Sequence, residues 1–251
     1  MCVNGLVSII TPTYNCGKFI GETIKSVQQQ TYTNWEMIIV DDCSADDTKK
    51  VVEKYQQQDE RIKYHCLTEN GGAAVARTKA MELATGQYMA FLDSDDLWMP
   101  DKLEKQLDFM QKNNYAFTST SYQHMSEDGV MLEKTLNAVN KTDYKRLLLD
   151  CPVGNSTVMY DVIRMGKFKV PNIRKRNDDA LWLTMLKKEK YIYGLSEVLM
   201  KYRLRKDSIS RKKWSLVKYT WYLYREIEHL SIFTSLWHIC WWGIIKVFKL
   251  K

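Results

Sequence analysis

The chain has 251 residues, of which 45% are hydrophobic and 27% charged, and this globular composition excludes a disordered or fibrous protein. Its six cysteines form no C-x-x-C pair, which argues against a disulfide framework and a zinc site. The net charge of +7 is concentrated near the C-terminus, where residues 201–251 carry twelve Lys and Arg against three acidic residues. Such a basic extension suits an anionic surface, either a membrane or a nucleic acid.

Strand and helix patterns alternate over the first hundred residues. Strands are predicted at 6–10, 35–40, 61–66 and 88–92, and helices at 18–30, 44–57 and 73–84. The N-terminus has no basic region and leads directly into the first strand, so we expect no signal peptide. The alternation predicts right-handed β–α–β units and therefore an α/β fold, with a mainly parallel sheet flanked by helices.

Polar clusters follow each of these four strands, at the edge of the sheet where such folds bind ligands. They comprise residues 11–15, the pair Asp41-Asp42, the turn at 70–72, and residues 93–96. Asp93 and Asp95 supply carboxylates, which are hard ligands suited to Mg²⁺ or Mn²⁺ together with substrate phosphates. Two acidic pairs on one edge would repel each other, so the pattern favours a bound cation over simple loop capping.

The Asn70-Gly71-Gly72 turn, followed by Arg77, offers close backbone approach and a positive charge to a diphosphate. Neither a G-x-G-x-x-G segment after the first strand nor a G-x-x-x-x-G-K-[ST] segment is present. The sequence therefore argues against NAD-dependent dehydrogenases and P-loop NTPases.

The second half of the chain is less regular. A helix is predicted after Pro100 and ends at about 113, and a second helix is predicted at 178–188. Strands are predicted at 115–122 and 155–160, with a closing strand from 191. Residues 123–150 have no assignment. Asp178 and Asp179 open the helix at 178–188. They either satisfy the helix dipole or provide a general base aimed at an acceptor hydroxyl.

Five segments of the chain resemble the family-2 glycosyltransferases, inverting enzymes with the GT-A fold that use nucleotide-sugar donors. The segments are VSIITPTYN (7–15), IIVDDCSADDT (38–48), NGGAAVARTKAMELATGQYMAFLDSDDLW (70–98), RNDDALWLTML (176–186) and YRLRKDSISRKK (202–213). The last is similar to bacterial surface-polysaccharide members of teichuronic-acid type. The resemblance implies a UDP-sugar donor and a glycan or polyprenyl-lipid-linked acceptor.

The resemblance also implies roles for individual residues. Those expected to bind the nucleotide sugar are Pro12, Tyr14, Asp42, Arg77, Asp93, Ser94, Arg203 and Arg205. Asp95, with Asp93, would hold the divalent cation, Mg²⁺ or Mn²⁺. Asp178 aligns with the catalytic base, with Asp179 as the alternative because Asn177 stands where the family usually has glutamate. Residues 207–210 would belong to a segment that closes over the diphosphate.

The basic charge and the tryptophan content of the C-terminal segment divide the chain into a GT-A domain at 1–210 and a basic helical tail at 211–251. The tail holds five of the eight tryptophans, and its uncharged run at 230–245 is shorter than the roughly 20 apolar residues of a spanning helix. We therefore expect tail helices lying on an anionic membrane, and a cytoplasmic enzyme peripheral to the inner face of the plasma membrane. The alternative for the tail is packing against the body or in a homodimer.

Three other functions compete with the glycosyltransferase interpretation. A D-x-D after a strand also occurs in haloacid-dehalogenase-type phosphatases, but there it follows an early strand. A non-catalytic nucleotide- or nucleic-acid-binding module could use the tail's aromatic and basic residues, but the acidic edge of the body would repel phosphate, so we expect no nucleic-acid partner. A sugar-1-phosphate nucleotidyltransferase would need a Gly-rich Arg loop after the first strand, which is missing.

Overall fold

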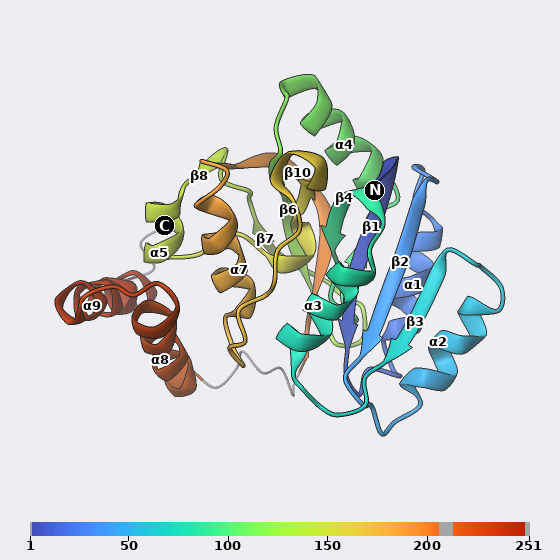
Figure 1. The fold of residues 1–251 in the computed structure, drawn as a ribbon, viewed down its shortest axis with the longest axis horizontal. Coiled ribbons are helices and arrows are strands. Elements are labelled where there is room, and N and C mark those ends of the chain that lie inside the picture. The colour runs from blue at the N-terminus through green and yellow to red at the C-terminus, as the bar shows by residue number, and fades with distance from the viewer. Residues whose placement is uncertain (1, 206–212, 249–251) are drawn as a thin grey trace.

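The computed structural model of the chain describes residues 2–205 and 213–248 (Figure 1). The strands are β1 (Val3–Thr13), β2 (Trp35–Asp41), β3 (Ile62–Cys66), β4 (Gly86–Phe91), β5 (Leu97–Trp98), β6 (Phe117–Ser126), β7 (Met131–Leu136), β8 (Lys141–Thr142), β9 (Met159–Asp161) and β10 (Ile192–Leu204). The helices are α1 (Ile20–Gln28), α2 (Thr48–Gln56), α3 (Ala73–Leu83), α4 (Lys102–Asn113), α5 (Tyr144–Leu149), α6 (Val162–Met165), α7 (Asn177–Leu186), α8 (Lys213–Tyr222) and α9 (Ile232–Phe248). A 3₁₀ turn (Asn155–Thr157) and a π-helical turn (Leu223–Ile227) complete the description.

All ten strands join one sheet, whose main order is β3-β2-β1-β4-β9-β6-β10-β5. The four strands at one end of this order, β3, β2, β1 and β4, are parallel to one another, as the alternation of strands and helices predicts. β9 joins β4 to β6 by antiparallel pairing on both sides, and β6 then pairs parallel with β10. The predicted α/β fold with helices on both faces of the sheet is confirmed.

Successive residues of the central strands face two separate cores. Ile9 and Ile39 point to the side covered by α1, α2 and α4, whereas Ile10 and Ile38 point to the side covered by α3, α5 and α7. This alternation follows from the period of two in an extended strand. Because helices cover both faces, the open polar edge at the carboxyl ends of the parallel strands is the place left for a ligand.

Two predicted elements differ from the structure because polar side chains form hydrogen bonds near their ends. The helix expected from Ser44 begins at Thr48, because the Ser44 hydroxyl donates to Asp41 (2.6 Å) and Asp46 accepts from the backbone N–H of Thr48 (3.0 Å). The strand expected at 155–160 starts with the 3₁₀ turn and is extended only from Met159. In that turn the Ser156 hydroxyl contacts the loop after β4, an interaction that no local periodicity reveals.

The C-terminal helices lie beside α5 and α7, at the end of the molecule opposite β3 and α2 (Figure 1). Leu223 and Tyr224 are buried in the core, and the Tyr224 hydroxyl donates to the carbonyl of Leu148 (2.6 Å). Lys187, the residue after α7, pairs with Glu228 (2.8 Å). The expected closing segment at 207–210 and the expected boundary at 210/211 lie outside the described residues. Among the helices that the structure describes, none has the length and apolar character to cross a membrane.

Candidate active site

The two aspartates after β2 organise the neighbouring loops. Asp41 accepts from the Ser44 backbone N–H (2.9 Å) and from the Tyr64 hydroxyl (2.7 Å), and it is buried. The two carboxylate oxygens of Asp42 accept from the backbone N–H groups of Gly71 (2.7 Å) and Gly72 (2.8 Å). Gly72 has a φ of +87°, which favours glycine. Asp42 therefore fixes the Gly-Gly turn that starts α3.

The loop after β4 carries the predicted metal ligands. Asp93 Oδ1 accepts from Asn155 Nδ2 (2.8 Å) and pairs with Arg77 Nη2 (3.1 Å). Asp95 Oδ2 pairs with Arg205 Nη1 (3.2 Å), and both side chains are about a quarter exposed (24% and 26%). Burial and the neighbouring charge of Asp93 raise the pKa of Asp95, and Arg205 opposes this rise. Two carboxylates thus share one partly open site.

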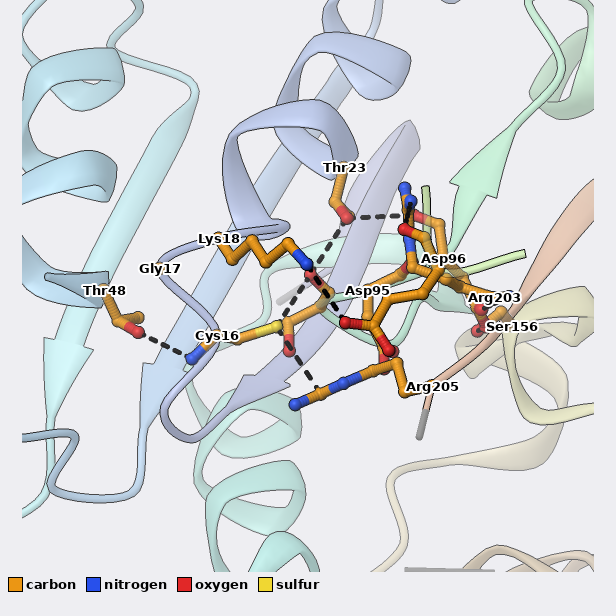
Figure 2. Close-up of polar contacts among 12 residues, drawn as sticks. Cys16, Gly17, Lys18, Thr23, Thr48, Asp95, Asp96, Ser156, Arg203 and Arg205 are labelled. Atoms are coloured by element: carbon orange, nitrogen blue, oxygen red, sulfur yellow. Dashed lines mark hydrogen bonds and ion pairs between the residues drawn. The ribbon is translucent and has the colours of Figure 1, made fainter. Parts of the chain in front are cut away.

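Beneath this site, Asp96 is fully buried and supports the loop (Figure 2). It accepts from the Ser156 hydroxyl (2.6 Å) and from the backbone N–H of Arg203 (3.0 Å). Burial, and then the charges of Asp95 and Asp93, raise its pKa well above the ordinary value. The Arg203 guanidinium donates to the carbonyl of Asp95 (2.8 Å) and pairs with Glu22 (2.6 Å), so β10 and α1 clamp the loop.

The loop between β1 and α1 closes the other side of the site (Figure 2). The carbonyl of Ser94 accepts from Cys16 Sγ (3.3 Å) and from the Thr23 hydroxyl (3.0 Å). The backbone N–H of Cys16 donates to Thr48 (2.8 Å). Burial raises the pKa of Cys16 to about 12, so its thiol is a neutral packing group rather than a nucleophile.

The two aspartates at the start of α7 have different surroundings. Asp179 Oδ2 pairs with Arg176 Nε (2.6 Å). Among the described residues, Asp178 has no side-chain partner. Burial and the charge of Asp179 raise the pKa of Asp178 to about 6, against the opposing effect of Arg77. A raised pKa in a site with a specific charged neighbour is typical of a catalytic acid or base.

Arg77 links the loop after β4 to α7. Its side chain is buried, and its Nη1 donates to the amide oxygen of Asn177, while Nη2 pairs with Asp93. Because Asn177 precedes Asp178, Arg77 brings the predicted base and the predicted metal site together. Both interactions orient the guanidinium toward the polar edge of the sheet.

The site has a donor set suited to a divalent cation that is held partly by its substrate. No group of three or more His, Cys, Asp and Glu side chains that could hold a metal occurs in the described part of the chain. Asp95 and the second oxygen of Asp93 would supply one or two carboxylates, and magnesium-type ions in phosphate-binding sites commonly take their other ligands from the phosphates and water. The residues therefore fit a cation that binds with a diphosphate.

The remaining predicted residues lie on the same edge with unequal exposure. Pro12 is buried at the end of β1 beside Val40, whereas Tyr14 is half exposed (51%). The guanidinium of Arg203 forms hydrogen bonds and an ion pair within the protein, whereas Arg205 is the more exposed of the two arginines. Sequence reasoning missed the supporting contacts from four side chains: Glu22, Asn155, Ser156 and Arg176. Only Arg176 had a signal, its position next to the acidic helix start.

Comparison with protein families gives one assignment. A family model described as Glycosyl transferase family 2 matches residues 8–172. This span includes the Gly-Gly turn and the aspartates after β2 and β4.

Two relatives are similar over most of their own length. TuaG of Bacillus subtilis (strain 168), named as a teichuronic acid biosynthesis glycosyltransferase, is 49% identical over 232 residues, which make up 92% of this chain and 92% of TuaG. WfgD of Escherichia coli, named as a UDP-Glc:α-D-GlcNAc-diphosphoundecaprenol β-1,3-glucosyltransferase, is 38% identical over 217 residues, or 86% of this chain and 84% of WfgD.

The fold also occurs in a solved structure of low sequence identity. The mannosyltransferase PcManGT from Pyrobaculum calidifontis, in complex with GDP-Man and Mn²⁺, has a TM-score of 0.67 and 16% identity to this chain. The match covers 95% of this chain and 73% of that one.

Proposed function

Because this chain belongs to glycosyl transferase family 2, we propose that it transfers a sugar from a UDP-sugar to a hydroxyl of a lipid-linked glycan in cell-surface polysaccharide synthesis. The chain is a glycosyltransferase by family. The name of WfgD supports UDP as the donor's nucleotide and a diphosphate-linked lipid as the acceptor's carrier, and the name of TuaG supports a surface polysaccharide as the product.

The observation that carries the proposal is the position of Arg77, which donates to Asn177, the residue before Asp178, and pairs with Asp93, two residues before Asp95. It joins a carboxylate with a pKa near neutrality to a pair of carboxylates that can bind a cation. A base on one side of the anomeric carbon and a diphosphate-binding site on the other are what a single displacement requires. Such a displacement inverts the anomeric configuration.

In this mechanism Asp178 accepts the proton from the attacking hydroxyl of the acceptor. Its pKa of about 6 leaves it mostly ionised at neutral pH while keeping it basic enough to take a proton. Asp179 supports this role, because its ion pair with Arg176 fixes the start of α7 and its charge raises the pKa of Asp178.

Asp95, with Asp93, would hold a divalent cation, Mg²⁺ or Mn²⁺, and the Mn²⁺ of PcManGT is consistent with that assignment. When bound, the cation would offset the charge of the departing nucleotide diphosphate. Arg205, which pairs with Asp95, would add positive charge at the same edge. Asp42 and the Gly71-Gly72 turn would shape the nucleoside pocket with Pro12 and Tyr14.

A transfer assay tests the function. The purified protein with Mn²⁺ and GlcNAc-diphosphoundecaprenol is given UDP-glucose, UDP-N-acetylglucosamine, GDP-mannose or dTDP-glucose, and mass spectrometry follows the lipid. We expect a gain of one sugar from a UDP-sugar and a larger rise in melting temperature with UDP than with GDP or dTDP, because only a bound ligand stabilises the fold. Release of phosphate from simple esters without sugar transfer would support a phosphatase instead.

We also propose that the C-terminal helices attach the enzyme to the inner face of the plasma membrane. Among the side chains of α9 whose burial the structure describes, five large apolar ones are exposed: Ile232 (53%), Phe233 (86%), Leu236 (48%), Trp237 (56%) and Trp241 (39%). Apolar and aromatic residues next to a surplus of Lys and Arg are typical of helices that lie in an anionic membrane interface.

Replacing Phe233 and Trp237 together with serine is expected to weaken binding to phosphatidylglycerol vesicles by about tenfold or more, because both aromatic rings are lost from the interface. Vesicle co-sedimentation measures the effect. The control, Val130→Ser with Ile163→Ser, removes two other apolar side chains that are also more than half exposed (64% and 61%) and should bind like the wild type. Unchanged vesicle binding with loss of a dimer in analytical ultracentrifugation would assign the α9 face to self-association.

A further inference from the structure

A cavity lies between the segment before α7 and the tail helix α8. Its volume is about 240 Å³. It is bordered mainly by Ile173, Arg174, Lys218, Tyr219, Trp221 and Tyr222. This volume is below the roughly 300–1,000 Å³ typical of sites that enclose a whole small molecule, so the cavity suits one part of a larger ligand.

The cavity lies beside the segment that leads into α7, whose first residues include the predicted base. Arg176 donates from Nη1 to the hydroxyl of Thr220 (2.6 Å) and pairs through Nε with Asp179 (2.6 Å). Arg174 is two residues before Arg176, and Lys218 and Tyr222 are each two residues from Thr220. Residues two apart on a helix lie on opposite faces, so Thr220 attaches α8 to the start of α7 while Lys218 and Tyr222 face the cavity.

The cavity combines positive charge with an apolar, aromatic surface. Arg174 and Lys218 are exposed, and none of the carboxylates in the described parts of the chain pairs with either of them. Ile173 is buried, and Tyr219 and Trp221 are partly buried. Arg and Lys are the side chains that recognise phosphate groups, and the apolar wall suits a hydrocarbon chain attached to them.

We propose that this cavity binds the isoprenoid diphosphate of the acceptor lipid, with Arg174 and Lys218 on the diphosphate and the aromatic wall against the first isoprene units. The proposal rests on the proposed function and gives the acceptor a site. A lipid diphosphate bound there presents its attached sugar toward Asp178 and leads its chain along α8 toward the exposed face of α9. Another cavity, of about 330 Å³, lies against α3; its lining includes Lys79 and Lys169, but Glu82 lies beside them and none of its lining side chains is aromatic.

Direct binding tests the site with water-soluble probes. Farnesyl diphosphate, inorganic pyrophosphate, farnesol and dioctanoyl phosphatidylglycerol are each titrated against the full chain by calorimetry. Farnesyl diphosphate should bind at least about tenfold more tightly than any of the other three, because only it satisfies both the cations and the apolar wall. Equal binding of pyrophosphate, or tighter binding of phosphatidylglycerol, overturns the proposal.

The double variant Arg174→Gln with Lys218→Gln should raise the Kd for farnesyl diphosphate and the KM for the lipid-linked acceptor by about tenfold, with an unchanged Kd for UDP. The matched control, Lys50→Gln with Lys54→Gln, removes two exposed charges from α2 at the far end of the molecule and should change none of these values. A double variant that behaves like the control contradicts the site.

The outcome for the site can be separated from the outcome for the reaction. If the wild type binds UDP but transfers no sugar to a diphosphate-linked lipid, the proposed function fails, and the farnesyl diphosphate titrations still decide whether the cavity binds an isoprenoid diphosphate. If transfer occurs and the double variant keeps the wild-type acceptor KM, the function stands and the acceptor site is wrong.

Discussion

Asp178→Asn is expected to lower turnover by about 10²–10⁴-fold while the Kd for the UDP-sugar stays near the wild-type value. Asparagine keeps the shape of the side chain but cannot accept the proton of the attacking hydroxyl. In the proposed mechanism the departing nucleotide diphosphate lies on the opposite side of the anomeric carbon, on the residues after β2 and β4, so its binding should not depend on this carboxylate. Single-turnover kinetics and titration with UDP measure the two effects separately.

The pH profile gives this prediction a second readout. Burial and Asp179 raise the pKa of Asp178 to about 6, and a base acts in its ionised form. Turnover should therefore be nearly constant above about pH 7 and fall about tenfold per pH unit well below 6. In Asp179→Asn the neighbouring charge is gone, so the acidic limb should move to lower pH.

Asp179→Asn also separates the two candidate bases. It breaks the ion pair with Arg176, so we expect a lower melting temperature and a moderate loss of turnover with the shifted pH profile. If Asp178→Asn keeps full activity and Asp179→Asn loses it, the base has been assigned one residue too early.

The first hundred residues could be interpreted well from the sequence because their structure is locally encoded. The strands β1, β2 and β4 contain apolar runs, all four of the strands β1 to β4 end in polar clusters, and each intervening helix has its own periodicity. Parallel strands connected by helices bring their carboxyl ends to one edge of the sheet. That rule predicts that Asp42, Asp93 and Asp95 lie on one edge of the sheet.

The second half could not be interpreted in this way because its order depends on distant partners. β9 has three residues and pairs with β4 through Tyr88 and Asp161, which are far apart in the chain. β6 and β10 pair over most of their length with the unassigned segment between them in sequence. A strand of three residues has too few positions for its period to be recognised.

The supports of the site were missed for a related reason. Ser156 contacts the loop after β4 from a turn 60 positions later, and Glu22 pairs with Arg203, which lies 181 positions away in the chain. The family resemblance predicts that Arg203 binds the nucleotide sugar. In the structure its buried guanidinium is used within the protein, so we expect Arg205 to be the arginine that approaches a diphosphate.

Asp95→Ala is expected to weaken Mn²⁺-dependent binding of UDP by at least about 100-fold, more than is usual for a group that only supports a metal ligand. Asp93 cannot replace it, because one of its oxygens is already used by Arg77 and Asn155. Calorimetric titration of UDP with Mn²⁺ and with a chelator measures the difference. Asp108→Ala, which removes an exposed aspartate from α4 (57% exposed side chain), is the matched control and should keep the wild-type dependence on Mn²⁺.

The stability of Asp95→Ala distinguishes a metal ligand from a structural carboxylate. Asp95 lies beside Asp93 and the buried Asp96, and their mutual repulsion, together with burial, raises the pKa values of Asp95 and Asp96. A cluster of this kind costs the metal-free protein stability, so removing Asp95 should leave the melting temperature unchanged or raise it, even though its pair with Arg205 is lost. A fall in melting temperature with intact Mn²⁺-dependent binding of UDP would mean that Asp95 holds the loop and the cation binds elsewhere.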